Sequence, residues 1–266
     1  MKKFYFLLLA AVVAMTSNAS AQFVQSSATT NTTKANTTTS PVPDCSSENF
    51  YVGYNIVSLE WSLVQGLMEN AFPLNSGITA GYNKRVSLNG SSLPLYVDYG
   101  ANFSYIFGSS EFTEEFEDYN FDNDCYEYVV EKNENSVNVA SINVPLAVTT
   151  PFQVDNVTIL PYIGVNLRFN LFGSLDIKET ETITDEYGES WVDDPYTEST
   201  DLFNKDDMGG YPFGRFKVGL NLGVNIEFEK YTVGIGYVND FSPVLDLEGL
   251  LTGTFSATTI SVGYKF

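Results

Sequence analysis

Apolar and polar residues alternate along much of the chain after residue 50. From Phe216 to Phe228 every second residue is apolar, and the residues between them are Lys, Glu, Asn or Gly. A period of two places the two sets on opposite faces of a β-strand, whereas a helix would spread both sets around its circumference. The final residues, from Ile260 to Phe266, repeat the pattern. Both segments therefore predict strands with one apolar face and one face of polar or small residues.

The same alternation predicts eight strands in total. They lie near residues 52–56, 78–88, 93–105, 142–148, 159–171, 216–228, 231–237 and 260–266. Short and long connections alternate between these strands. The short ones are residues 89–92, 155–156 and 229–230, and the long ones are residues 59–76, 109–136, 172–213 and 239–253. This rhythm places all short turns at one rim and all long connections at the other, as in an up-and-down barrel with short periplasmic turns.

Alternation alone does not decide which face of the strands points inward. A soluble barrel of the lipocalin type has its apolar face inside, whereas a membrane barrel turns that face to lipid. Three features favour the membrane barrel. Glycines such as Gly164 and Gly223 crowd the polar face, aromatic residues lie near strand ends on the apolar face, and the chain ends on Phe266. We therefore predict an all-β fold, an eight-stranded antiparallel up-and-down transmembrane β-barrel with long acidic outer loops.

The N-terminal residues predict export. Residues 1–21 combine a short positive start, an apolar run and a small-residue cleavage pattern, which is typical of a signal peptide. Residues 22–49 are rich in Ser, Thr and Asn and predict a disordered periplasmic tether, after which residues 50–266 form the barrel. Cys45 and Cys125 fall at opposite rims of this topology, so we expect no disulfide between them.

Composition excludes several classes of function. The chain has 13 Lys and Arg against 33 Asp and Glu, which excludes binding of nucleic-acid phosphates through a basic face. It has no His, which excludes Ser-His-Asp hydrolysis and His-ligated zinc, and its two Cys cannot form a four-cysteine site. We therefore expect no enzyme, no cofactor and no nucleic-acid partner. An enzyme that uses only paired carboxylates stays open, although nothing in the sequence marks such a pair.

Charged residues on the polar faces are candidates for the barrel interior. They are Arg85, Asp98, Arg168, Arg215, Lys217, Glu227 and Lys265. One interpretation is a plug of ion pairs, because eight strands enclose a space just wide enough for side chains. The other is a gated, anion-preferring path past Arg168, Arg215 and Lys217. The narrow bore favours the plug.

Two long stretches, 111–135 and 176–207, hold most of the acidic residues. The simplest interpretation is a solvated anionic surface. A second is contact with a protein, because tyrosines and Trp191 are interleaved with the acids. A third is a divalent-cation site, although neither stretch fits the calcium-loop motif. Its weak candidates are Asp118, Asp122, Asp124, Asp185 and Glu189.

Several strands resemble those of a known family. Tyr264 and Phe266 close an amphipathic strand in the way of the sorting signal of bacterial outer-membrane barrels. The segments that resemble the outer-membrane β-barrel domain of Bacteroidota, including PorT-like and small porin-like proteins, are 142–148, 160–167, 218–228, 233–237 and 260–266. The resemblance covers roughly residues 50–266. It implies an outer-membrane location, no catalytic residues, and membrane lipid and the barrel-insertion machinery as partners.

Two function classes follow. The first is a non-enzymatic outer-membrane barrel whose acidic loops bind a surface ligand or an envelope protein, adhere, or support the envelope. An assembly factor for a secretion system, which the PorT-like resemblance implies, is a variant of this class. The second is a small gated channel or a membrane enzyme. Outer-membrane proteases and phospholipases rely on His, which this chain lacks.

Overall fold

The computed structural model describes residues 45–62, 65–88, 94–120, 125–185, 187–210, 212–249 and 251–266. The predicted signal peptide at 1–21 and all but the end of the predicted tether at 22–49 lie outside these residues. No helix among the described residues is long and apolar enough to cross a membrane.

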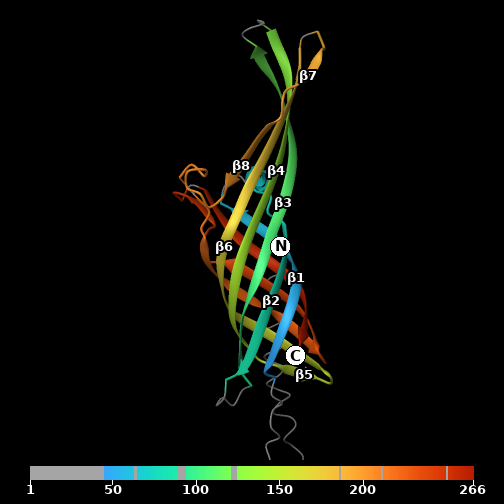
Figure 1. Ribbon diagram of the computed structural model, residues 1–266, viewed down its shortest axis with the longest axis vertical. Coiled ribbons are helices and arrows are strands. Elements are labelled where there is room, and N and C mark those ends of the chain that lie inside the picture. Colours follow the sequence, from blue (N-terminus) through green and yellow to red (C-terminus); the bar gives the residue numbers. More distant parts are fainter. Residues whose placement is uncertain are drawn as a thin grey trace, which may run out of the picture. The chain divides into compact units, whose positions relative to one another are not determined.

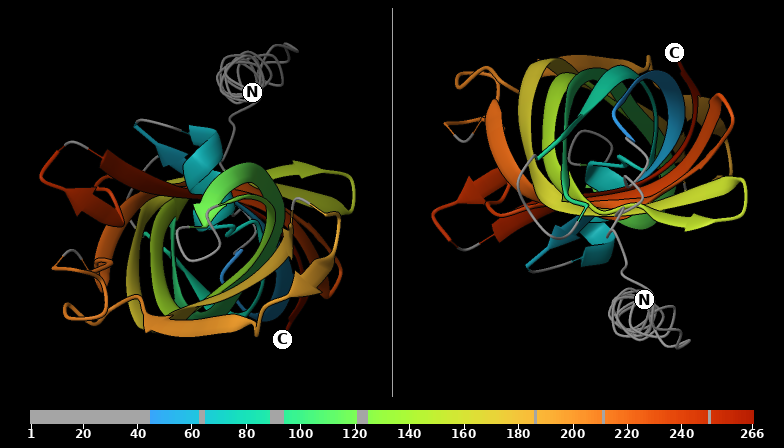
Figure 2. Two further views of the ribbon diagram at one scale, coloured as in Figure 1. Left: turned by 90° about the horizontal axis from the view of Figure 1, so that it is seen from above. Right: turned by 90° about the horizontal axis from the view of Figure 1, so that it is seen from below.

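Eight long strands of the described chain form one closed ring, which Figure 1 shows from the side and Figure 2 from its two ends. Each strand pairs antiparallel with the next one, and the last pairs with the first. The strands are β1 (Ser47–Trp61), β2 (Ser76–Ser87), β3 (Tyr96–Asn120), β4 (Cys125–Thr149), β6 (Val157–Thr184), β9 (Phe216–Phe228), β10 (Tyr231–Asp240) and β12 (Leu251–Lys265). The predicted all-β, antiparallel, up-and-down order is confirmed, and β1 starts slightly before residue 50.

Two of the predicted short turns are present, at residues 155–156 and 229–230. The first residue of each, Asp155 and Glu229, has a φ of 52°, the left-handed conformation that tight hairpin turns require. The third predicted short turn, at 89–92, lies outside the described residues. The short turns therefore lie at one end of the ring, which we call the turn end.

The prediction of outer loops at residues 109–136 and 172–213 is wrong, because both segments consist mostly of strand. β2 pairs with β3 only as far as Phe107, but β3 and β4 continue to pair up to Asn120 and Cys125. β6 follows them to its end and is flanked by the short strands β7 (Ser190–Val192) and β8 (Tyr196–Asp201). Figure 1 shows this sheet rising beyond the ring. We call it the extension; it comprises residues 108–120, 125–137 and 174–184, with β7 and β8.

The extension escaped the strand prediction because charged residues occur on both of its faces. Glu114 pairs with Glu131 on one face, and Glu117 pairs with Tyr128 on the other. Apolar and polar residues therefore do not alternate, although Tyr, Phe, Val and Thr still favour strands. The other long connections contain a short helix, α2 (Gln65–Ala71), and the short strand β11 (Leu245–Leu247). A last short strand, β5 (Phe152–Val154), pairs with β6 at the turn end.

Burial in the ring is the reverse of burial in a soluble barrel. Exposed apolar side chains cover the outside of all eight ring strands. They include Phe50, Val52, Ile56, Ile78, Phe103, Ile142, Leu146, Ile163, Val165, Phe216, Ile226, Val233, Ile235, Ile260 and Val262. Buried polar side chains fill the inside. They include Asn49, Asn55, Thr79, Arg85, Asp98, Ser104, Asn143, Asn166, Asn221, Glu227 and Thr232. The predicted inward direction of the polar face is confirmed.

An apolar cluster, which we call the plug, fills the end of the ring opposite the turns. It combines inward positions of the ring strands with residues of the long connections. Its buried members are Val57, Leu59, Trp61, Leu74, Ile106, Val137, Val139, Leu175, Leu202, Phe203, Phe213, Val244, Leu245, Phe255 and Ala257. Phe72, which follows α2, bridges the ring to the connections. Its ring centroid lies 5.6 Å from that of Trp61 and 5.5 Å from that of Phe213.

Candidate functional site

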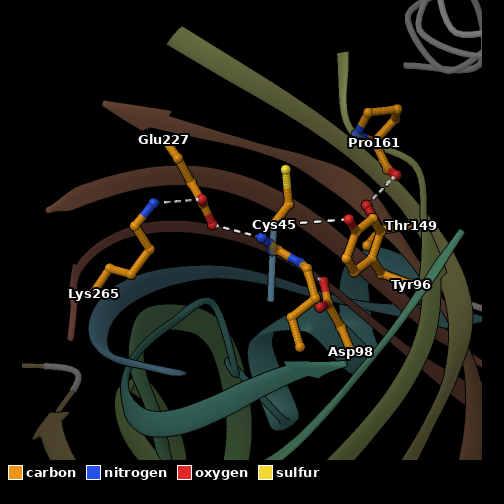
Figure 3. Close-up of polar contacts among 8 residues, drawn as sticks. Cys45, Tyr96, Asp98, Thr149, Pro161, Glu227 and Lys265 are labelled. Atoms are coloured by element: carbon orange, nitrogen blue, oxygen red, sulfur yellow. Dashed lines mark hydrogen bonds and ion pairs between the residues drawn. The ribbon is translucent and has the colours of Figure 1, made fainter. Parts of the chain in front are cut away.

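Four charged side chains form an ion network inside the turn end of the ring. Arg85 Nε lies 2.8 Å from Asp98 Oδ1, and Arg85 Nη1 lies 2.7 Å from Glu227 Oε1. Lys265 Nζ reaches the second oxygen of Glu227 at 3.0 Å (Figure 3). Arg85 and Asp98 face each other across β2 and β3, so strand register places them in contact. Sequence analysis assigned all four residues to the interior, and the structure joins them.

Cys45 enters the ring beside this network. Its backbone N–H donates to the Tyr96 hydroxyl at 3.1 Å, as Figure 3 shows. Thr149 donates to the carbonyl of Pro161 at 2.8 Å and ties β4 to β6 at the same end. Cys125, in contrast, opens β4 at the tip of the extension. The two cysteines therefore lie at opposite ends of the long β3–β4 hairpin, as the predicted topology requires.

A second charged group lies below the plug. Arg168 forms a buried ion pair with Asp240, and its guanidinium carbon lies 3.7 Å from the centroid of the Phe255 ring. Lys217 pairs directly with Arg168 across β6 and β9 and donates to the carbonyl of Pro243. The prediction for Arg215 is wrong. Arg215 precedes β9, and its exposed side chain donates to the Leu171 carbonyl. The first inward-facing residue of β9 is Lys217, so the alternation of the strand does not extend to Arg215.

Between the ion network and the plug lies a polar cavity of about 130 Å³, which we call the chamber. Asparagines from six of the ring strands line it: Asn49, Asn55, Asn83, Asn102, Asn143, Asn166, Asn221 and Asn225. Asn143 Nδ2 donates to Asn102 Oδ1 at 2.9 Å, and Asn166 Nδ2 donates to Asn143 Oδ1 at 3.3 Å. The chamber thus has charged side chains at one end and apolar side chains at the other.

Two glycines make room for a large side chain in this chamber. A Cβ on Gly223 or Gly236 would lie 2.5 Å from the hydroxyl oxygen of Tyr162, well inside contact distance. The inward glycines therefore let the Tyr162 side chain extend from β6 over the neighbouring strands β9 and β10. Sequence analysis placed Gly223 on the polar face, but it predicted a plug of ion pairs and missed the apolar plug. The available signal was the aromatic content of the connections, such as Phe72 and Phe213.

Ion pairs cover one face of the extension. Lys132 Nζ lies 3.1 Å from Glu111 and 2.8 Å from Glu134, and Lys178 Nζ lies 3.0 Å from Glu134. Hydrogen bonds from Lys132 and Lys178 lower the pKa of Glu134. Cross-strand register places these residues side by side on β3, β4 and β6.

The opposite face of the extension gathers carboxylates. Oxygens of Glu131, Glu179 and Glu181 lie within 4.8 Å of one another. Partial burial raises the pKa of Glu179, and the charges of Glu131 and Glu181 raise it further. Like charges on paired strands repel, so this row weakens the extension while all three groups are ionised. Sequence analysis did not single out these three residues.

Among the described residues, the predicted cation candidates do not form a group of three possible metal ligands. Asp118 is exposed on β3, and Asp122 and Asp124 lie outside the described residues. Asp185 forms a turn, because its Oδ1 accepts the backbone N–H groups of Tyr187 and Glu189 at 2.9 and 2.8 Å. The structure therefore gives Asp185 a local structural role.

No protein-family model matches the chain, and no curated protein matches it. Several solved structures are similar to it. Ail, the attachment invasion locus protein of Yersinia pestis, solved in complex with the heparin analogue sucrose octasulfate, has a TM-score of 0.33 and 10% identity. The alignment covers 83% of this chain and 99% of Ail.

A major outer membrane protein from Thermus thermophilus has a TM-score of 0.27 and 13% identity, over 82% of this chain and 99% of that one. The translocator domain of the autotransporter NalP from Neisseria meningitidis has a TM-score of 0.21 and 11% identity, over 97% of both chains.

Proposed function

We propose that this chain is an integral outer-membrane β-barrel without enzyme activity, which presents the extension at the cell surface as a binding surface. The observation that carries the proposal is the reversed burial of the ring. Val52 is 63% exposed, Ile163 is 59% exposed and Phe50 is 61% exposed, while Arg85 and Glu227 are each only 4% exposed. Soluble monomers rarely expose apolar patches of more than a few hundred Å². Lipid is the solvent that matches such an outer face.

Aromatic pairs support a membrane orientation. At the turn end, the rings of Phe50 and Phe266 stack with centroids 5.5 Å apart. Towards the other end, Phe169 and Phe216 lie 4.8 Å apart. Aromatic girdles of this kind mark the two interfaces of a barrel with the bilayer. The exposed Phe266 also fits recognition of the last strand by the barrel-insertion machinery, and the predicted signal peptide at 1–21 fits export.

The extension supports a role in binding. Within it, Tyr126 is 65% exposed and Tyr196 is 57% exposed, and Tyr187, in the connection that leads to β7, is 83% exposed; acidic residues lie close to all three in the sequence. Exposed aromatic side chains are frequent anchors of protein interfaces. Binding, adhesion and envelope support all use such a surface. A role as a secretion-assembly factor stays an alternative with the same geometry, whereas the ion network and the apolar plug inside the ring disfavour a channel.

The lipid contact can be tested with one substitution and a matched control. Val165 lies midway along the ring part of β6, and Val192 lies in the extension; both are exposed. V165R should cost about 2–4 kcal/mol of unfolding free energy in lipid vesicles, because a charge meets the bilayer core. V192R should stay within about 0.5 kcal/mol, because water surrounds it. Equal tolerance of the two variants would contradict a lipid-facing ring.

The surface exposure of the extension can be tested with the native cysteines. In intact cells, a membrane-impermeant maleimide should label Cys125 in the C45S variant. It should not label Cys45 in the C125S variant until the outer membrane is permeabilised. Labelling of Cys45 alone in intact cells would reverse the proposed orientation and place the extension in the periplasm.

A further inference from the structure

The outer part of β3 is an open strand edge. β2 pairs with β3 only as far as Phe107, and no other described strand pairs with that side of β3 (Figure 1). α2 covers the next residues, because the Asn70 carbonyl accepts a hydrogen bond from Ser110 Oγ. From Glu111 to Asp118 every residue except the half-buried Phe112 is exposed. We call residues 111–118 the open edge.

Strand register decides which backbone groups of the open edge point away from β4. The carbonyl of Phe107 faces the side of β2, where it accepts the N–H of Asn75 at 3.4 Å. The backbone direction alternates along a strand, and β3 pairs with β4 without a register shift throughout the extension. The residues that turn both N–H and C=O to the open side are therefore Glu111, Thr113, Glu115 and Glu117. The N–H of Tyr119, the next in this series, donates to Asp118 Oδ1 at 2.8 Å, which fits the same direction.

The charge of the open edge selects what can pair with it. Proteins usually protect a long edge strand with proline, a bulge or lysine side chains, because unpaired backbone groups attract other strands. The open edge has no proline, no lysine and no register shift against β4, but five of its eight residues are acidic. Lys132 lies 3.1 Å from Glu111, and no ion pair among the described residues involves the other four carboxylates.

This negative charge excludes one class of partner and favours another. A second copy of the chain would bring five carboxylates against five, and like charges on neighbouring strands repel. A strand with Lys or Arg side chains would meet opposite charges instead, so the same residues that repel acidic strands attract basic ones.

We propose that the open edge binds a basic segment of another protein, which adds to the extension as an extended strand beside β3. This inference rests on the proposed function and names the kind of partner that the extension takes. The outward backbone groups would hold any extended chain, and the side chains would select its sequence. One face of the open edge alternates apolar and acidic residues, which are Phe112, Glu114, Phe116 and Asp118. A matching strand has an apolar residue opposite each phenylalanine and a basic residue opposite each acid.

The probe is the peptide Lys-Lys-Val-Lys-Lys-Thr-Val-Lys, which matches the open edge in antiparallel register. Amide exchange of the isotope-labelled full chain in lipid nanodiscs is followed residue by residue. Without peptide, the amides of Thr113 and Glu115 should exchange fast, and those of Phe112 and Glu114 slowly, because β4 accepts only the latter two. With peptide at about ten times its dissociation constant, exchange at Thr113 and Glu115 should slow by about tenfold. Exchange at Phe112 and Glu114 should not change.

A modified peptide separates strand pairing from attraction by charge. N-methylation of every second residue, starting with the second, keeps all charges but removes the N–H groups that would donate to the open edge. This peptide should bind at least about tenfold more weakly, since it loses several hydrogen bonds. Equal affinity of the two peptides, absence of binding, or binding that leaves the amides of Thr113 and Glu115 unchanged would overturn the inference.

A matched pair of variants makes the same test from the side of the chain. T113P removes one outward N–H group but no hydrogen bond to β4, whereas T113V keeps that group. T113P should weaken binding of the unmodified peptide, and T113V should bind it like the wild type. The peptide result is also separable from the proposed function. Maleimide labelling that places the extension in the periplasm would remove its role at the cell surface, whereas unresponsive amides at Thr113 and Glu115 would remove only the strand partner.

Discussion

Arg85 is the side chain whose loss should destabilise the ring most. It donates to Asp98 through Nε at 2.8 Å and through Nη2 at 3.3 Å, and to Glu227 through Nη1 at 2.7 Å. Replacement by Met keeps most of the volume but removes every one of these donors. Glu227 then keeps only Lys265, which is itself 29% exposed, and Asp98 loses the cation that it is paired with. We expect R85M to unfold the barrel at a markedly lower urea concentration than the wild type.

The size of the effect follows from burial. The side chains of Arg85 and Glu227 are each 4% exposed, and that of Asp98 is 8% exposed. Removing one partner of a buried ion pair costs about 3–5 kcal/mol, since an uncompensated charge is left behind. R85M combined with D98N restores neutrality and should recover much of this loss. Coupling between the two sites should therefore be well above the error of the measurement.

Lys84 is the matched control for this experiment. It neighbours Arg85 on β2 and forms an ion pair of 2.6 Å with Glu48, but the two side chains are 38% and 37% exposed. Water screens such a pair, so its loss should change the unfolding free energy very little. Urea unfolding in lipid vesicles, followed by tryptophan fluorescence, measures both variants. If R85M costs no more than K84M, the ion network does not hold the turn end together.

Two further predictions concern conduction and pH. The purified chain in planar bilayers should show no large stable pore, because the Arg85 network and the apolar plug fill the two ends of the ring. The F213A variant should allow brief openings. A persistent porin-sized current through the wild type would contradict this prediction. Between pH 7 and mildly acidic pH, amide-exchange protection of the extension should rise as Glu179 protonates, because its pKa is raised in the folded state. Below pH 4.5 protection should fall as Glu134 protonates, because its pKa is lowered in the folded state. E179Q should abolish the rise and E134Q the fall, and an unchanged profile in both variants would refute the assignment.

The ring was predictable from sequence because lipid and a narrow bore impose opposite chemistry on alternate residues. Where the strands face lipid, most outward positions are apolar, and below the plug most inward positions are polar or small, so a period of two is visible in β9 and β12 without further information. The positions of Arg85 and Asp98 followed from the same pattern. Their contact did not, because the register between β2 and β3 depends on a connection that carries no periodic signal.

The extension and the plug depend on context that a local pattern does not contain. In the extension, neighbours such as Glu114 and Glu115 are both exposed, so hydrophobic periodicity is absent although the backbone is a strand. The plug joins Leu74 to Phe213, which are far apart in sequence. A local pattern predicts an apolar residue in a long connection to be a loop residue. Its burial follows only from the closed ring, which places all the long connections at one end. The prediction that Arg215 faces the interior is wrong for a related reason. Alternation assigns inward positions only within a strand, and the sequence does not show that β9 starts after Arg215.

Polar contacts in the interior of this ring specify which face of each strand points inward. If the interior were wholly apolar, both faces of a strand would be apolar and nothing would distinguish them. The asparagine contacts from Asn102 through Asn143 to Asn166 join three consecutive ring strands, and a slip of one residue would turn them into lipid. The extension lacks such an interior. Its strands continue directly from β3, β4 and β6, so the ring fixes their register, and the exposed ion pairs of Lys132 and Lys178 need only support it. The acidic surface can therefore carry repelling carboxylates that would not form a stable sheet on their own.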